Sequence, residues 1–310
     1  MRHIAVLFAA AAVFCGSARN ACPEQVPAAF ADIGYGARPM GMAGAYTAVS
    51  NDANAIAWNP AGLALLKGRE GIFMNTNQKN LIPYSYAVYG QRLFSGIVIG
   101  GGAVYSGDEA LSETTVMYSM AKPISYRYWG YGYYRKTYIK TCVGATYKLR
   151  LAEFGNNSDG GPDRITGSAQ GHTIDVGLLT ELKDRFFLGL AIHEFAGVLM
   201  WDSSSSGEYQ ENIPRTFVMG MSYMNPGKVV VAGDLEYPGR IRLGVEKKVA
   251  GILALRLGYN QKLDKEAVGE YSAGIGLDRM ELGLISVAVN ISYRIERLAD
   301  TMRMSASVRF

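Results

Sequence analysis

From Arg69 to the end of the chain, apolar and polar side chains alternate with a period of two. In residues 285–294, for example, every second residue is apolar or aromatic, and the residues between them include Ser286, Asn290 and Arg294. Such alternation is typical of β-strands whose two faces lie in different environments. The sequence therefore predicts an all-β fold for most of the chain, with a charged face that recurs strand after strand.

Counting these segments gives about fourteen strands, an even number within the range of bacterial outer-membrane barrels. The links at one end are short, as in residues 91–93 and 183–185, and those at the other end are long and hydrophilic, as in residues 153–170 and 196–212. A soluble β-sandwich explains each strand alone, but number and connectivity favour a transmembrane antiparallel β-barrel. The predicted strands are residues 70–78, 82–91, 94–105, 113–121, 137–152, 171–182, 186–195, 213–223, 228–236, 240–248, 252–260, 270–278, 281–294 and 302–310.

The start of the chain is typical of a secretory signal peptide over residues 1–18, with Arg2 before a short apolar run. A lipoprotein signal anchored at Cys15 or Cys22 is the alternative. The mature chain would retain Cys22 and Cys142, which are too few for a disulfide framework, although one pair is possible. The balance of 31 basic against 27 acidic residues argues against a nucleic-acid partner.

One stretch does not alternate: residues 36–66, GARPMGMAGAYTAVSNDANAIAWNPAGLALL, are rich in Gly and Ala and contain few charges. Pro60 fixes its own φ and biases Asn59 away from the helical region, so a turn is expected there. We predict a compact segment with short helical pieces. The expected organisation is a signal peptide (1–18), an N-terminal plug or hatch (19–68) and a transmembrane barrel (69–310).

This motif resembles the N-terminal segment of the FadL-type outer-membrane transporter superfamily, and in particular its PorV/PorQ-like branch, in which a Trp-Asn-Pro-Ala-Gly-Leu run closes the segment. Residues 213–224 and 229–249 resemble the family more loosely. The resemblance implies a barrel of fourteen strands with a hatch in its lumen, a hydrophobic ligand that enters from outside, and a kinked third strand that opens sideways. The chain is short for a FadL transporter, and the PorV branch is linked to protein export, so the resemblance specifies architecture better than cargo.

Two groups of residues are candidates for function. The hatch motif would anchor the plug, or it is an ordinary helix-start turn; its members are Trp58, Asn59, Pro60, Ala61 and Gly62. A glycine run inside the third predicted strand would mark a kink or lateral opening, or it makes room for the hatch; its members are Gly100, Gly101 and Gly102.

Three further features bear on the barrel. Phe310 ends the last amphipathic strand and resembles the signal read by the outer-membrane assembly machinery. Residues 123–136, rich in Tyr, are expected to form an aromatic belt at the membrane interface, with a strand extension or a partner-binding flap as alternatives. The inward charges have mixed signs and are expected to pair across strands and fasten the hatch; they are Lys148, Arg150, Asp175, Glu181, Asp234, Glu236, Arg242, Glu246, Arg256 and Arg294.

The sequence shows no catalytic constellation, metal site or cofactor motif: His193-Glu194 lacks the second His of a zinc protease, because position 197 is Gly. The predicted function is passage of hydrophobic, fatty-acid-like molecules across the bacterial outer membrane. The alternative is a PorV-like component that docks exported proteins in a secretion system. The expected partners are outer-membrane lipid, a hydrophobic ligand, the assembly machinery and, in the alternative, secretion-system proteins.

Overall fold

The structure is a computed structural model and describes residues 34–78, 82–108, 110–129, 137–155, 164–205, 207–225, 227–263, 269–296 and 300–310. The predicted signal peptide and residues 19–33 of the predicted plug lie outside the described residues, as does Cys22.

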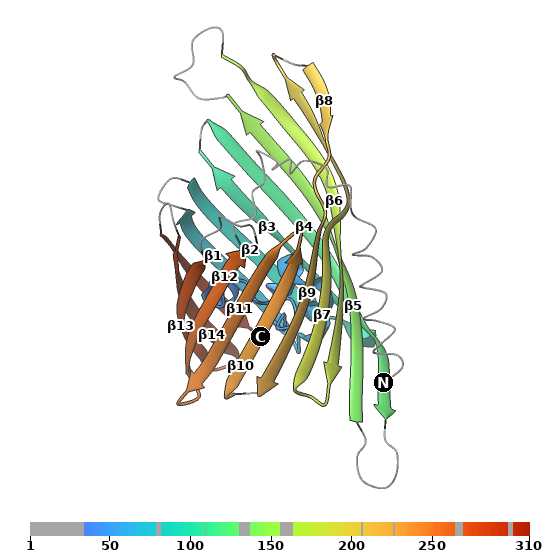
Figure 1. The fold of residues 1–310 in the computed structure, drawn as a ribbon, viewed down its shortest axis with the longest axis vertical. Helices are drawn as coiled ribbons and strands as arrows, with labels where there is room; N and C mark the ends of the chain where they lie inside the picture. Colours follow the sequence, from blue (N-terminus) through green and yellow to red (C-terminus); the bar gives the residue numbers. More distant parts are fainter. Residues whose placement is uncertain are drawn as a thin grey trace. The chain divides into compact units, whose positions relative to one another are not determined.

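The described chain begins with short helices and continues as a long series of strands (Figure 1). The helices are α2 (Ala37–Gly41), α3 (Ala55–Trp58), η1 (Pro60–Leu65) and, between two strands, η2 (Phe94–Gly96). The strands are β1 (Arg69–Gln78), β2 (Ile82–Arg92), β3 (Val98–Gly107), β4 (Leu111–Trp129), β5 (Thr137–Phe154), β6 (Gly167–Leu182), β7 (Phe186–Ser203), β8 (Gly207–Glu211), β9 (Thr216–Asn225), β10 (Val229–Tyr237), β11 (Arg240–Val249), β12 (Leu253–Lys262), β13 (Glu270–Leu282), β14 (Ile285–Ile295) and β15 (Thr301–Arg309).

All of the strand pairings are antiparallel, and two of them close the sheet into a ring. β1 pairs with β15, and β6 pairs with β7. β8 and β9 share one position in the ring, because β8 pairs with the upper part of β7 (Leu199–Ser203) and β9 with its lower part (Phe186–His193). Fifteen strands with one shared position give a closed barrel of fourteen, and this confirms the predicted fold class.

The two faces of each strand differ as the alternation predicts. The charged row faces inward and is buried: Arg256 is 2% exposed. The apolar row faces outward, where its neighbour Leu257 is 68% exposed. In water such a surface would be unfavourable, whereas in lipid it removes apolar area from water, and a closed ring leaves no backbone edge without partners. The barrel therefore presents a lipid-facing apolar exterior.

The wall is not of uniform height. β4 to β7 have 16 to 19 residues, whereas β9 to β15 have 9 to 13. In Figure 1 the green strands of this taller side rise past the ends of the orange ones. The prediction of a loop over residues 196–212 is wrong in this region, because β7 continues to Ser203 and β8 pairs back onto it.

Part of the Tyr-rich segment is a strand, and its role as an aromatic belt at the membrane interface stays a prediction. Residues 123–129 continue β4 and pair with β5 as far as Trp129↔Thr137, after a register shift between Pro123 and Ser125. They are a strand extension, one of the alternatives, and residues 130–136 lie outside the described residues. No helix among the described residues has the length and hydropathy needed to cross a bilayer.

Candidate functional site

Residues 34–66, which we call the inner segment, lie within the ring of strands. Almost all of them are buried. η1 packs against β4, β5 and β6, and α2 packs against β13 and β14 on the other side. In Figure 1 this blue segment is surrounded by strands of the barrel.

The Asn59-Pro60 turn joins the inner segment to the barrel wall. The Asn59 Nδ2 donates to the Thr47 carbonyl at 2.8 Å and to the Leu178 carbonyl of β6 at 3.2 Å. Its Oδ1 accepts from the Ala61 amide at 3.2 Å, which caps η1 where Pro60 begins it. One buried amide side chain thus holds the turn, a second part of the inner segment and the wall together.

Paired glycines in the wall make room for this turn. Gly144 of β5 and Gly177 of β6 are cross-strand partners. A Cβ on Gly144 would lie 2.4 Å from the carbonyl carbon of Pro60, and one on Gly177 would lie 2.2 Å from Asn59 Oδ1. Neither position therefore accepts a side chain while the turn stays in place.

The same arrangement recurs around the ring, and we call each such pair a glycine seat. In every seat, two glycines face each other across neighbouring strands and the inner segment lies within close reach of where a Cβ would be. The four seats are Gly90–Gly100, Gly144–Gly177, Gly189–Gly220 and Gly244–Gly258.

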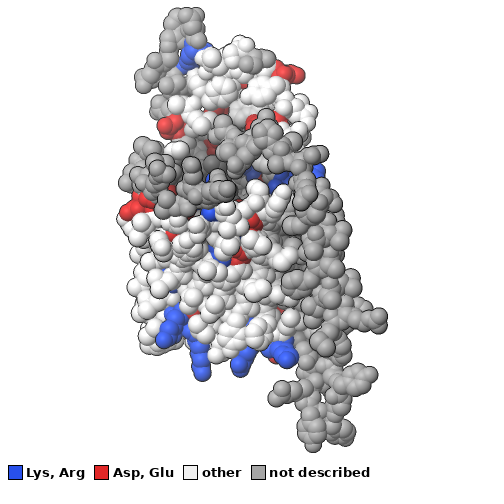
Figure 2. All heavy atoms as spheres, in the orientation of Figure 1, with Lys and Arg blue, Asp and Glu red and all other residues white. Residues whose placement is uncertain are grey.

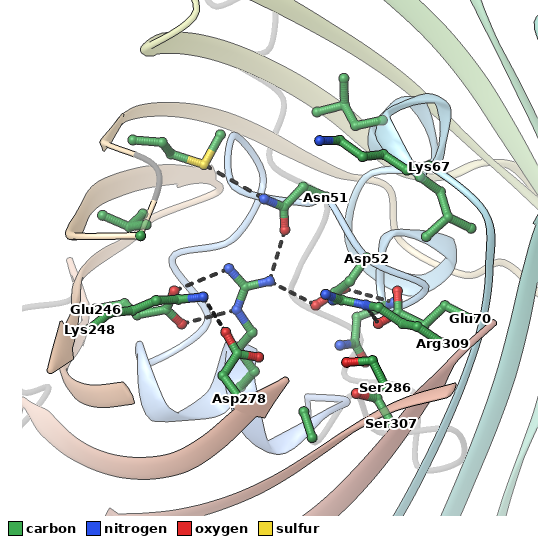
Figure 3. A pocket seen from close by; sticks show the side chains of 18 of the residues that line it. Asn51, Asp52, Lys67, Glu70, Glu246, Lys248, Asp278, Ser286, Ser307 and Arg309 are labelled. Atoms are coloured by element: carbon green, nitrogen blue, oxygen red, sulfur yellow. Dashed lines mark hydrogen bonds and ion pairs between the residues drawn. The ribbon is translucent and has the colours of Figure 1, made fainter. Parts of the chain in front are cut away.

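Arg38 is the electrostatic centre of the inner segment. Its guanidinium lies 2.9 Å from Asp52 Oδ2 and 3.0 Å from Glu246 Oε2, and it donates to Tyr46 Oη at 2.9 Å and Asn51 Oδ1 at 2.8 Å. Three of these partners, Asn51, Asp52 and Glu246, are labelled in Figure 3. Burial by itself lowers the pKa of Arg38, but the charges of Glu246 and Asp52 raise this pKa well above its ordinary value. The guanidinium therefore stays charged and binds two carboxylates from different parts of the fold.

Carboxylates of the wall bind the inner segment at two further points. Asp234 Oδ2 of β10 accepts the backbone amides of Tyr46 and Thr47, each at 2.9 Å. Glu70 of β1 accepts the Ala53 amide at 3.0 Å and the guanidinium of Arg309 of β15 at 2.7 Å, so it also joins the first and last strands. Charge-assisted bonds of this kind are stronger than neutral ones.

A second charge network lies in the wall itself, where β7 bulges. Glu194 has a positive φ of 56° and faces inward, where Lys148 Nζ lies 2.9 Å from Glu194 Oε1 and 2.8 Å from Asp175 Oδ2. Arg150 also pairs with Glu194, at 2.5 Å. Together with Arg242–Glu236 and Arg256–Glu246, these pairs confirm the prediction that inward charges of mixed sign pair across strands.

A cavity of about 890 Å³ opens at the short-turn end of the barrel, between the inner segment and the wall. Its lining carries charges of both signs, including Arg38, Asp52, Glu70, Lys228 and Glu246. Figure 3 shows Asp52 of the inner segment together with Glu70 and Glu246 of the strands around this cavity, and Figure 2 shows Lys and Arg along the lower rim of the molecule. We call this cavity the mouth.

The remaining predicted site residues have the following positions. Trp58 donates from Nε1 to the Tyr35 carbonyl at 2.9 Å and contacts Tyr46 edge-on, within the inner segment. Gly62 packs closely against Ser50: a Cβ on Gly62 would lie 2.1 Å from the Ser50 carbonyl oxygen. Phe310 follows β15 with its side chain 63% exposed, and its role as an assembly signal stays a prediction.

The three strand glycines have different surroundings. A Cβ on Gly100 would lie 2.7 Å from Ile56 Cδ1 of the inner segment, whereas one on Gly101 would meet only the Met117 carbonyl oxygen, at 3.3 Å. A Cβ on Gly102 would meet the backbone of β2. β3 keeps an unbroken register with β2 and β4 through all three, so the predicted lateral opening stays a prediction.

Several residues of the site were not singled out in the sequence. They are Arg38, Asp52, Glu70 and every glycine of the four seats except Gly100. The signal in the sequence was the recurrence of Gly in the inward row of consecutive strands. Among the described residues there is no cluster of His, Cys, Asp and Glu that could hold a metal ion.

A closed ring of antiparallel strands in even number, with a lipid-facing apolar row and a buried ionic interior, defines the protein as an outer-membrane β-barrel. No protein-family model matches the chain, and no curated protein matches it.

Several solved structures have a similar fold. The CymD monoaromatic hydrocarbon channel has a TM-score of 0.57 and 14% identity, over 90% of this chain and 97% of that one. The Pseudomonas putida toluene transporter TodX has 0.52 and 15%, over 89% and 97%. A Pseudomonas aeruginosa FadL homologue has 0.54 and 11%, over 88% and 97%. The fold is thus similar to that of FadL-type hydrocarbon channels over nearly the whole chain, and these comparisons do not support the PorV/PorQ branch.

Proposed function

We propose that this outer-membrane barrel passes hydrophobic small molecules across the bacterial outer membrane, and that the inner segment is the hatch that controls their passage. The proposed cargo class is apolar or amphiphilic, as in fatty acids and small aromatic hydrocarbons. The titles of the similar structures name monoaromatic hydrocarbons and toluene as what those proteins carry.

The observation that carries the proposal is an apolar strip along the inner wall of β1 to β4. Nine inward residues of these strands are buried and apolar or aromatic, although Glu70, Thr76, Ser106 and Ser119 of the same rows are polar: Ile72, Met74, Tyr84, Tyr86, Val88, Val98, Val104, Met117 and Ala121. The interiors of outer-membrane barrels are usually polar, so such a strip is informative.

The inner segment turns its own apolar side chains toward this strip. Tyr35 stacks on Tyr86 with ring centroids 5.2 Å apart, Ile56 lies against Gly100, and Leu63 lies against Gly90. A small shift of the inner segment would open an apolar path along the strip, where a hydrophobic solute would replace the contacts that the inner segment gives up.

The test is uptake of radiolabelled oleate and toluene into proteoliposomes that contain the purified protein. The informative variant is the double substitution Val88→Thr with Val104→Thr, which adds two hydroxyls to the strip at almost constant shape. Since each hydroxyl without a partner in an apolar site costs about 1 to 3 kcal/mol, we expect uptake to slow by about tenfold. The matched control is Val218→Thr, an inward buried residue of β9, on the other side of the ring.

Wild-type uptake no faster than in empty liposomes would overturn the proposal. So would equal slowing by the control and the double variant. A structure of detergent-extracted protein provides an independent check, because lipid-like density between Tyr35 and the β2–β3 wall is the expected result.

A further inference from the structure

The inward faces of β14 and β15 are polar from one end of the barrel to the other. These strands are neighbours in the ring, and Ala288 is the one apolar residue in the two inward rows between residues 286 and 309. We call the set the polar stripe; its members are Ser286, Asn290, Ser292, Arg294, Thr301, Arg303, Ser305, Ser307 and Arg309. It contrasts with the apolar strip of β1 to β4, which begins at the next strand.

Several side chains of the stripe are buried and have no hydrogen-bond partner among the residues that the structure describes. Ser292 is 2% exposed and Thr301 is fully buried, and neither hydroxyl has a partner; the same holds for Asn290 Oδ1. The adjoining inward residues Asn260 of β12 and Ser272 of β13 add two more such atoms. A buried donor or acceptor that makes no hydrogen bond costs about 1 to 3 kcal/mol, so such groups normally bind protein or water. Five of them in one region indicate a surface that is built to meet water or a polar solute.

The inner segment packs against this stripe through the short helix α2. α2 crosses it, and the Ala37 amide donates to Ser305 Oγ at 3.3 Å. Nearby, Gly41 of α2 lies against the Cα of Gly274. Small residues on both sides, Ala37 and Gly41 against Ser305 and Gly274, mean that a small separation opens a gap lined by hydroxyls.

The lower end of the stripe opens directly into the mouth. Ser286, Asn290, Ser305 and Ser307 are lining residues of that cavity. The unpartnered Ser292 and Thr301 follow above them on the same two strands, toward the long-loop end. The stripe is thus a polar track that begins at an open cavity and continues past the inner segment.

We propose that the polar stripe is a second path, which carries small hydrophilic solutes and ions between α2 and the β14–β15 wall. It is separate from the apolar strip, which serves hydrophobic solutes. Hydroxyl and amide groups along a narrow path replace part of the hydration shell of a passing ion or small solute, as in other membrane pores. Separation of α2 from the stripe lets water satisfy the unpartnered groups, and this gain offsets part of the lost contact.

The test is the KCl conductance of the purified full-length protein in planar lipid bilayers. The variant is Ser305→Leu, which places a branched apolar side chain in the track. The matched control is Ala306→Leu, one residue away on the lipid-facing side of the same strand. We expect discrete conductance steps from the wild type, a loss of about fivefold or more in Ser305→Leu, and values near wild type in Ala306→Leu.

A second pair keeps the test decisive if Ser305→Leu does not fold. Ser292→Leu narrows the track higher up, and its control is Ile291→Leu on the outward face. Folding of every variant is checked by the heat-dependent shift of the barrel band in gel electrophoresis. Conductance of the wild type equal to that of a bare bilayer, or folded inward and outward variants that lose conductance alike, would overturn the proposal. Oleate uptake of Ser305→Leu at the wild-type rate would show that the two paths are separate.

Discussion

Gly144 and Gly177 face each other across β5 and β6 directly beneath the Asn59-Pro60 turn, and the space that their missing side chains leave is filled by that turn. The wall and the inner segment are therefore complementary surfaces, each shaped by the other. This relationship explains why glycine recurs in a barrel interior that otherwise carries polar and charged side chains.

Gly144→Ala should loosen this fit. The added Cβ would lie 2.4 Å from Pro60, so the turn or the wall must shift. We expect a loss of about 1 to 3 kcal/mol in stability, which is typical of overpacking. It is measured as a lower temperature for the loss of the folded band in gel electrophoresis. Gly71→Ala is the control, because its Cβ would have no neighbour closer than 3.9 Å; an equal shift in both variants would contradict the explanation.

Arg38→Met should release the inner segment while leaving the barrel closed. Its removal leaves Asp52 without its guanidinium partner and Glu246 with only Arg256. Breaking a buried ion pair by removing one partner costs about 3 to 5 kcal/mol. Hydrogen exchange at the amides of residues 36–53 should therefore accelerate by orders of magnitude, whereas amides of β11 change little. The exposed Lys247→Met is the control, and unchanged exchange in Arg38→Met would refute this role.

Asp234→Ala should weaken a different anchor. Its carboxylate accepts the amides of Tyr46 and Thr47, and without it both amides lose their partner inside the barrel. Since each unmade buried hydrogen bond costs about 1 to 3 kcal/mol, we expect local exchange at these two amides to accelerate first. Asp202→Ala, an exposed carboxylate of β7, should leave them unchanged. Protection that stays at the wild-type level in Asp234→Ala would argue against this anchor.

The glycines of β3 separate two explanations for the Gly-rich run. Gly100→Ala adds a methyl 2.7 Å from Ile56 Cδ1 and should destabilise the inner segment, whereas Gly101→Val meets only the Met117 carbonyl oxygen and should fold normally. If β3 opens sideways, the branched Val stiffens the strand and uptake of oleate slows by about an order of magnitude. Normal oleate uptake by folded Gly101→Val would contradict the prediction of a lateral opening at Gly101.

The period of two predicted the strands well, because lipid outside and a polar interior impose the same alternation on almost every strand. The pattern failed to predict the strand segments in which this alternation is absent. β4 continues past Pro123 with a register shift between Pro123 and Ser125, and a Pro in a Tyr-rich run resembles a loop. β8 lies on the taller side, where the short run Gly207–Glu211 shows no apolar row.

The site was less predictable than the barrel. Asn59 and Pro60 were found because a turn has a local signal, whereas Arg38 and Glu246 are 208 positions apart and meet only after the ring has closed. A glycine seat can be predicted only when the register of its two strands and the path of the inner segment are both known. The sequence of a single strand contains neither.

Glu70 has a consequence for how such a molecule is completed. Its two oxygens are shared between Arg309 of the final strand and the Ala53 amide of the interior. If the inner segment is missing from the lumen, or if β15 has not yet paired with β1, this buried carboxylate lacks one of its two partners. Pairing of β1 with β15 and placement of the inner segment inside the barrel therefore stabilise each other, and biogenesis favours the chain in which both are complete.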